Sequence, residues 1–289
     1  MKKLLFLLLF PLGILSAQQS IIKESLIVKS KLLGREVKYS IYLPSDHGTS
    51  RRYPVLYLLH GLSDNETGWT QFGEVKHIAD KQTNSGESTP MIIAMPDGGR
   101  GWYVNAADGT SRYEDFFINE FIPFIDSTYQ TRTEKRYRAI AGLSMGGFGT
   151  CIMSMKHPDL FAAAAPLSAG IFTNDEIINM PDENWNGAFS IPYGKNGKGK
   201  DRLSEHYKNN SILDIVSKKS TDELKKVRYY IDCGDKDFLI KGNMALHAAL
   251  IDKKVPHEFR VRNGIHNWPY WRSALPEVLI FVSESFHQN

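Results

Sequence analysis

The pentapeptide Gly-Leu-Ser-Met-Gly at 142–146 constrains the fold of this 289-residue chain more than any other segment. It lies between an apolar run at 137–141, typical of a buried strand, and a helical pattern at 145–157. A glycine-flanked serine at such a strand-to-helix turn has a strained backbone, which lifts its hydroxyl above the edge of the sheet. The segment therefore predicts an open α/β sheet with Ser144 exposed at one edge.

Apolar and amphipathic runs alternate along the rest of the chain, a pattern typical of parallel strands joined by helices. Because such crossovers are right-handed, we expect a three-layer α/β sandwich: a mostly parallel, eight-stranded sheet with helices on both faces. An antiparallel pair should open the chain and turn near Gly34, and Pro123 should break a helix. The expected strands are 21–30, 35–43, 55–59, 91–95, 137–141, 162–168, 227–233 and 257–261, and the expected helices are 113–129, 145–157, 242–253 and 269–286.

The first 17 residues read as a separate unit. Lys2 and Lys3 precede an apolar run at 4–15, and small residues follow at 16–17. That order is typical of a cleavable signal peptide, and the run is shorter than the roughly 20 residues that a membrane-spanning helix needs. The sequence therefore predicts a signal peptide at 1–17. The mature protein should be exported to the periplasm or the medium, without stable membrane insertion.

Charge balance and cysteine content exclude several functions. With 35 Lys and Arg against 32 Asp and Glu, the chain lacks the basic excess that nucleic-acid binders show. Cys151 and Cys233 are too few for a disulfide framework or a structural zinc site, so we expect two buried thiols. No metal or organic cofactor is expected, and the oligomeric state stays open.

One segment interrupts the alternation of strands and helices. Residues 173–212 are rich in Asn, Gly, Lys and Asp and show little periodicity. Irregular segments of this length in a compact domain are usually functional or disordered. The segment is therefore either a cap over a pocket or a surface excursion, inserted in a single domain that spans 18–289.

A serine hydroxyl needs a neighbouring base before it can act as a nucleophile. His266 follows the last expected strand, so its loop should reach the carboxyl edge of the sheet, where open α/β folds bind ligands. His60 also follows a strand, but it precedes the serine, whereas the order for such a site is Ser, acid, His. We therefore predict Ser144 as nucleophile and His266 as base, with His60 shaping its own loop.

The imidazole in turn needs a carboxylate that holds its tautomer. Three candidates surround the end of the strand at 227–233. Asp232 is still in the strand, and Asp235 lies in the turn, where it could instead satisfy backbone N–H groups. Asp237 is far enough along the loop to turn back toward the histidine and is the preferred candidate, although Asp235 stays open.

An oxyanion beside Ser144 would need N–H donors. The expected pair is the backbone N–H of Met145, directly after the serine, and that of Leu62, after the strand at 55–59. Aromatic side chains could form the binding surface, since they suit phenolic rings and sugar faces. The candidates are Trp69, Trp102, Trp185 and Trp268.

With these residues identified, the chain resembles the esterase D-like "putative esterase" branch of the α/β-hydrolases. That branch includes feruloyl and acetyl esterases of carbohydrate esterase family 1, tributyrin-type esterases, S-formylglutathione hydrolases and mycolyltransferases. The resemblance covers roughly residues 35–286 and implies the same triad and oxyanion positions. It rests on Tyr57–Gly61 with Trp69, Met95–Gly98, Gly142–Gly147, Cys233–Asp237, and His266–Trp268 with Trp271.

The resemblance and the predicted export together imply an exported serine carboxylesterase that removes feruloyl or acetyl groups from plant polysaccharide through an acyl-enzyme. The stretch at 96–99 with Trp102 and Tyr103 looks more like the feruloyl and small-ester esterases than the S-formylglutathione hydrolases. Three alternatives remain: a short-chain esterase, a thioesterase of the S-formylglutathione hydrolase type, and an acyltransferase to a sugar acceptor. A non-catalytic carbohydrate-binding protein is disfavoured, because every triad position has a candidate.

Overall fold

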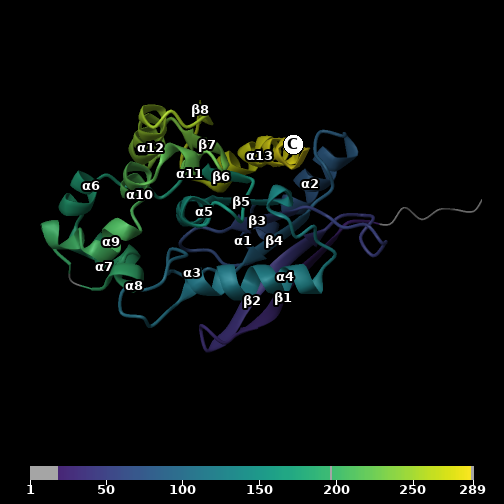
Figure 1. Ribbon diagram of the computed structural model, residues 1–289, viewed down its shortest axis with the longest axis horizontal. Helices are drawn as coiled ribbons and strands as arrows, with labels where there is room; N and C mark the ends of the chain where they lie inside the picture. Colours follow the sequence, from purple (N-terminus) through teal and green to yellow (C-terminus); the bar gives the residue numbers. More distant parts are fainter. Residues whose placement is uncertain (1–18, 196, 288–289) are drawn as a thin grey trace, which may run out of the picture.

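In the computed structural model, which describes residues 19–195 and 197–287, eight strands form one sheet in the order β1-β2-β4-β3-β5-β6-β7-β8 (Figure 1). β2 pairs antiparallel with β1 and β4, and all other neighbours pair in parallel, so the predicted sheet is confirmed. The signal peptide predicted at 1–17 lies outside the described residues. The strands are β1 Ile21–Ser30, β2 Arg35–Leu43, β3 Val55–Leu59, β4 Ile92–Pro96, β5 Arg138–Leu143, β6 Ala163–Leu167, β7 Arg228–Gly234 and β8 His257–Arg262.

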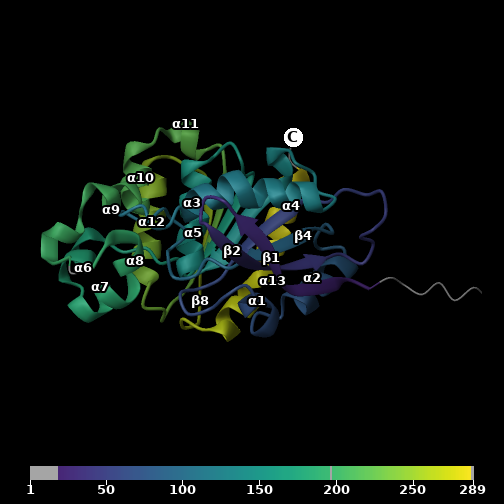
Figure 2. The same ribbon diagram turned by 90° about the horizontal axis from the view of Figure 1, so that it is seen from below.

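Helices cover both faces of this sheet (Figures 1 and 2). Successive side chains of a strand point to opposite faces, so β3 supplies both cores: Leu56 and Leu58 pack with α2 and α13, while Tyr57 and Leu59 pack with α3 to α5. The sequence pattern did not predict α2. The helices are α1 Gly68–Gln71, α2 Val75–Asn84, α3 Tyr113–Phe116, α4 Ile122–Thr128, α5 Met145–Lys156, α6 Asn174–Asn179, α7 Asp182–Ala188, α8 Ser190–Tyr193, α9 Glu205–Asn209, α10 Ile212–Lys218, α11 Thr221–Leu224, α12 Ile240–Asp252 and α13 Trp268–His287, with 3₁₀ turns at Lys135–Tyr137 and Gly199–Arg202.

The break expected near Pro123 takes the form of a π-helical segment, Phe117–Phe121, between α3 and α4. Ile122 N–H donates to Phe117 O, five residues back. Because Pro123 has no N–H to continue an α-helical ladder, the helix widens just before it. The wider turn keeps the rings of Phe117 and Phe121 buried against Tyr57.

Within 173–212, the described residues 173–195 and 197–212 fold largely into short helices, which lie together to one side of the sheet in both views (Figures 1 and 2). α6 to α9 contain four to seven residues each. Helices of one or two turns are too short to show a hydrophobic period, which is why the sequence pattern misses them. Local caps define some of them instead: Thr173 and Glu176 form a capping box at the start of α6.

The carboxyl ends of the parallel strands bring three loops to one edge of the sheet. Ser144 directly follows β5, and Asp237 and His266 lie in the loops after β7 and β8. Since β6 is the only strand between β5 and β7, these loops are neighbours. Within residues 19–195 and 197–287, none of the helices has both the length and the apolar character that crossing a bilayer requires.

Candidate active site

Ser144 occupies the turn between β5 and α5 with φ +55° and ψ −116°, a region that residues with side chains rarely adopt. The turn is tight because two neighbours lack side chains. A Cβ atom on Gly142 would lie 2.6 Å from Gly146 O, and one on Gly146 would lie 2.5 Å from Leu59 O. Ser144 N–H donates to Leu167 O of β6 at 2.9 Å, so the adjacent strand helps to hold the strained residue.

The structure brings Ser144, His266 and Asp237 together. Ser144 Oγ lies 2.9 Å from His266 Nε2, and His266 Nδ1 lies 2.8 Å from Asp237 Oδ2. Because the carboxylate can only accept, Nδ1 carries the hydrogen and Nε2 is the acceptor for the Ser144 hydroxyl. The side chain of Asp237 is fully buried and that of His266 is 17% exposed, so only the imidazole reaches the solvent side of the site.

Burial alone would raise the pKa of Asp237. Hydrogen bonds from His266 and from Leu239 N–H outweigh that effect, with a smaller contribution from Ser168, and hold the pKa below its usual value. The carboxylate therefore stays ionised beside the imidazole at neutral pH.

Sequence reasoning missed Ser168, which follows β6. Its side chain is buried, its φ is +43°, and its hydroxyl oxygen accepts Trp271 Nε1–H at 3.1 Å; the same hydroxyl helps to lower the pKa of Asp237. A left-handed φ at a buried serine is a strain that surrounding contacts must maintain. Nothing in the local sequence marks this residue, because its significance depends on which loops meet at the sheet edge.

The two other carboxylates considered as the acid hold the His266 loop from outside. Asp235 Oδ1 accepts a backbone N–H of that loop at 2.9 Å. Asp232 is fully buried in β7 and binds Arg262, which precedes His266, and Tyr270, which follows it. One carboxylate thus anchors both ends of the loop that carries the imidazole.

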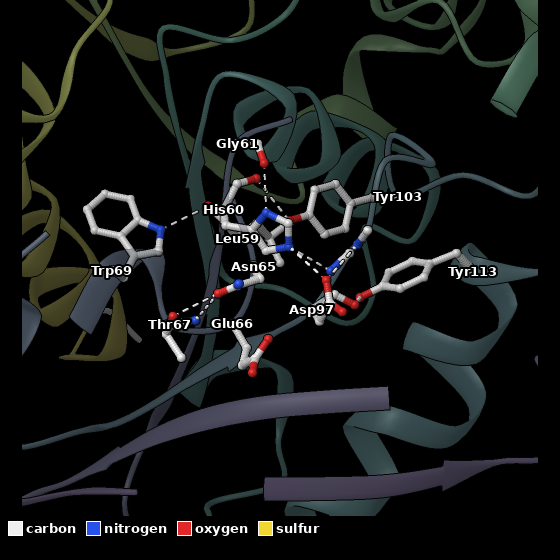
Figure 3. Close-up of polar contacts among 12 residues, drawn as sticks. Leu59, His60, Gly61, Asn65, Glu66, Thr67, Trp69, Asp97, Tyr103 and Tyr113 are labelled. Carbon is white, nitrogen blue, oxygen red and sulfur yellow. Dashed lines mark hydrogen bonds and ion pairs between the residues drawn. The ribbon is translucent and has the colours of Figure 1, made fainter. Parts of the chain in front are cut away.

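His60 shapes the loop after β3, as expected (Figure 3). Its Nε2 accepts Gly98 N–H at 2.8 Å, so Nδ1 carries the hydrogen and donates to Gly61 O at 2.7 Å. The Tyr103 hydroxyl donates to His60 O at 3.0 Å. Because Gly61 O and Leu62 N–H belong to one peptide group, the imidazole fixes the direction of that N–H.

Two backbone N–H groups are available beside Ser144. Neither Leu62 N–H nor Met145 N–H donates to another protein group within the described part of the chain. Met145 begins α5, where the helix dipole favours negative charge. A Cβ atom on Gly61 would lie 3.7 Å from Ser144 Cβ, so the loop of Leu62 lies against the serine. The arrangement can accept a developing oxyanion.

A cavity of about 480 Å³ opens at Ser144 and Leu62. Its wall is mainly apolar, with polar side chains from the loop after β4 and from α7. Trp102 and Phe189 stack at 4.6 Å between ring centroids and 22° between planes, and the Trp102 indole N–H donates to Ala188 O at 2.7 Å. The apolar part of the wall includes Trp102, Phe172, Met180 and Phe189. The polar part includes Arg100, Glu183 and Asn184.

The four tryptophans occupy different places. Trp102 lines the cavity, whereas Trp69 and Trp185 are each only 1% exposed, so the expectation that these two contact a ligand is not met. Their indole N–H groups instead donate to backbone carbonyls in the interior, at Leu59 and Gly194. Trp268 lies outside the cavity, partly exposed, with its ring edge-on to Trp69 at 5.2 Å.

Other features lie apart from this site. A larger hollow, of about 720 Å³, is lined by Arg52, Arg132 and Arg136 at the amino ends of β3 and β5, on the opposite edge of the sheet. Cys151 and Cys233 are buried and unpaired. Across the residues that the structure describes, no three His, Cys, Asp or Glu side chains converge as a metal site.

Comparison with known proteins shows which family this chain belongs to. The family described as "Putative esterase" matches residues 30–282. An endo-1,4-beta-xylanase/feruloyl esterase of Xylanibacter ruminicola is 35% identical over 156 residues, which are 51% of this chain and 22% of that protein. An acetyl esterase of Caldicellulosiruptor saccharolyticus is 23% identical over 88% of this chain and 96% of its own length. The chain thus spans less than a third of the first relative but nearly all of the second.

Solved structures show the same fold. A ferulic acid esterase superposes with a TM-score of 0.79 at 34% identity, covering 93% of this chain and 99% of its own. An S-formylglutathione hydrolase of Staphylococcus aureus superposes with a TM-score of 0.74 at 24% identity, covering 92% and 99%. The eight-stranded sheet and these neighbours confirm the predicted α/β-hydrolase fold.

Proposed function

The chain belongs to the "Putative esterase" family and is a carboxylic-ester hydrolase, and from that premise we propose that it is a serine esterase acting through Ser144, His266 and Asp237 on feruloyl-type esters of carbohydrate. The observation that carries the proposal is the unbroken chain of contacts, 2.9 Å and 2.8 Å long, at the mouth of an aromatic-walled cavity.

The reaction proceeds in two halves. Ser144 Oγ attacks the ester carbonyl and passes its proton to His266 Nε2, while Asp237 stabilises the imidazolium through Nδ1–H. Leu62 N–H and Met145 N–H donate to the oxyanion. His266 then gives the proton to the departing alcohol oxygen and leaves an acyl-Ser144. In the second half, a water molecule attacks the acyl group and passes a proton to His266 Nε2. The bond between the acyl group and Ser144 Oγ then breaks, His266 returns the proton to Ser144 Oγ, and the free acid departs.

The cavity favours an aromatic acyl group over acetyl. Four rings, Trp102, Phe172, Phe189 and Phe238, line a space of about 480 Å³, far more than an acetyl group fills. A planar cinnamoyl-type acid offers these rings a matching face. Arg100, Glu183 and Asn184 can bind hydroxyl or methoxy substituents on its ring.

The insertion contributes directly to this cavity. Met180, Glu183, Asn184 and Phe189 all come from residues 173–212. We therefore favour the cap over the surface excursion, within one domain that spans 18–289. Export by the signal peptide at 1–17 completes the proposal, since a polymeric sugar ester is an extracellular substrate.

Initial rates test the proposal. The purified protein and its Ser144→Ala variant are assayed on methyl ferulate, p-nitrophenyl acetate, acetylated xylan and S-formylglutathione. We expect the highest kcat/KM for methyl ferulate, and a kcat at least about 10³-fold lower in the variant, because triad members act as a unit. Hydrolysis of p-nitrophenyl acetate alone would leave a short-chain esterase, and preference for S-formylglutathione would identify a thioesterase.

A further inference from the structure

The loop after β3 contains a carboxylate that the proposed mechanism does not use. Its neighbours are hydrogen-bonded: Asn65 Oδ1 accepts Thr67 N–H at 2.9 Å (Figure 3), and Glu66 Oε1 accepts the Ser25 hydroxyl at 2.8 Å. Asp64, by contrast, has no hydrogen-bond or ion-pair partner for its side chain among residues 19–195 and 197–287. The side chain is half-buried, and this burial raises the pKa of its carboxyl group, against an opposing effect of His60.

Half-buried carboxylates are normally hydrogen-bonded, because leaving the desolvated oxygens without a donor costs free energy. With no donor from the described part of the chain, the Asp64 oxygens are left to water or to the hydroxyl groups of a bound ligand. Its backbone is fixed, since Asp64 N–H donates to Gly61 O at 3.2 Å and closes the turn that contains Leu62.

Asp64 lies close to the nucleophile. A Cβ atom on Gly61 would lie 3.5 Å from Asp64 Oδ2 and 3.7 Å from Ser144 Cβ, so the carboxylate and the serine flank the same glycine. Neither Asp64 nor Trp268 belongs to the described residues that line the 480 Å³ cavity. The carboxylate therefore lies near the nucleophile but outside the cavity assigned to the acyl group.

Aromatic side chains adjoin this carboxylate. A Cβ atom on Gly68 would lie 3.3 Å from Asp64 Cγ and 3.4 Å from Trp268 Cζ2, so the carboxylate and the indole lie against the same glycine. The ring of Phe72, which is 51% exposed, lies 5.9 Å from that of Trp268 with 36° between planes. Two rings at this shallow angle form an open platform rather than a cage.

The proposed mechanism places the alcohol of the ester on this side. His266 Nε2 must reach the departing oxygen, so the alcohol lies next to the imidazole. Trp268 belongs to the same loop-to-helix segment as His266, two residues further along.

We propose that Asp64, Trp268 and Phe72 form the alcohol subsite and that it takes a sugar ring: hydroxyl groups donate to the Asp64 carboxylate while the apolar face of the ring covers the aromatic platform. This inference rests on the proposed function, whose acyl half it leaves unchanged. It makes Asp64 a specificity-determining residue for the first half of the reaction only.

Two esters of one acid isolate this effect. Methyl ferulate and a feruloyl ester of arabinose form the same feruloyl-Ser144, so their kcat/KM values differ only through binding and departure of the alcohol. The ratio of the two values is measured for the wild type, Asp64→Ala, Asp64→Asn, Phe72→Ala and a matched control, Asp252→Ala. Asp252 is an exposed aspartate at the end of α12, remote from this loop.

The wild type should prefer the arabinose ester. Asp64→Ala should lower the ratio about tenfold or more, as expected for a lost hydrogen bond to a charged group, with smaller losses for Asp64→Asn and Phe72→Ala. The ratio for Asp252→Ala should equal that of the wild type. An unchanged ratio in Asp64→Ala would overturn the subsite while leaving the esterase proposal intact. A higher kcat/KM for feruloylcholine than for the arabinose ester would also overturn it, because the choline cation likewise suits a carboxylate beside aromatic rings. Hydrolysis of neither ester by the wild type would instead refute the proposed function.

Discussion

Trp271 Nε1–H donates to Ser168 Oγ at 3.1 Å and thereby ties the last helix, α13, to the end of β6. The same hydroxyl helps to lower the pKa of Asp237, and the Trp271 ring lies edge-on to the imidazole of His266 at 4.8 Å. Ser168, after β6, and Trp271, in α13, thus pack behind the proposed triad. These two side chains orient the acid and the base before any substrate binds.

Ser168→Ala should therefore weaken catalysis without unfolding the protein. Losing this hydroxyl, which holds the Trp271 indole and helps to lower the pKa of Asp237, is expected to lower kcat/KM by up to about tenfold. The pKa of Asp237 should rise, so activity should disappear at a higher pH on the acid side. Ser168→Thr should restore part of the rate. Ser154 is a matched control, because it is also buried but donates to Thr150 O within α5. Equal pH profiles for Ser168→Ala and Ser154→Ala would contradict this role.

The Asp232 carboxylate should matter for stability. In Asp232→Asn the guanidinium of Arg262 loses its buried partner, and the free energy of unfolding should fall by about 3 kcal/mol. Urea unfolding measures the change. Asp235→Asn changes an exposed carboxylate three residues further along the chain, and it should lower the free energy of unfolding by less than about 1 kcal/mol. Similar losses in the two variants would show that Asp232 does not anchor the loop.

The local pattern of strands and turns was enough to predict most of the architecture. A buried apolar run followed by glycine or by a polar loop identifies the carboxyl ends of β5 and β7, whereas β8 is a short strand with no fully buried residue. The three ends meet because the strands are parallel. For this reason Ser144, Asp237 and His266, chosen from sequence, lie within hydrogen-bond distance of one another. Their roles in catalysis remain predictions.

Features that depend on contacts distant in sequence were not accessible in this way. The sequence gives no sign that Trp69 and Trp185 turn into the interior, since a tryptophan suits a core as well as a pocket. Ser168 and Asp64 likewise look like ordinary loop residues. Ser168 is positioned by its hydrogen bond with Trp271 of α13, and Asp64 is positioned by the turn that begins at Gly61.

The acyl cavity predicts a change in selectivity. Phe189→Ala removes the ring that stacks on Trp102, so the ratio of kcat/KM for methyl ferulate to that for p-nitrophenyl acetate should fall about tenfold. Ile191→Ala changes an exposed residue of the same insertion and serves as control. A parallel loss on both substrates in Phe189→Ala would indicate a folding defect instead of a pocket.

Acid should destabilise the protein partly through Glu114. Burial works to raise the pKa of this carboxyl, but His157 and Lys156, at 2.9 Å and 2.6 Å, hold the pKa below its usual value. The folded state therefore binds fewer protons than the unfolded state. The resulting stability is present above the unfolded pKa of about 4.3 and is lost as pH falls through the lower, folded pKa.

Glu114→Gln should consequently be less stable than the wild type at neutral pH, and the difference should shrink as the pH falls to about 3. Urea unfolding at several pH values measures this convergence. Exposed Glu183 has no such ion pair in the described structure, and Glu183→Gln should leave the pH dependence as it is. A difference that stays constant with pH would contradict the assignment.

A feruloyl group on Ser144 would be the most direct sign of the proposed chemistry. The protein is quenched in acid during turnover of methyl ferulate, digested, and analysed by mass spectrometry. We predict one added feruloyl group on the peptide that contains Ser144, and none in Ser144→Ala. Turnover without any acylated peptide, or with the group on another residue, would contradict nucleophilic attack by Ser144.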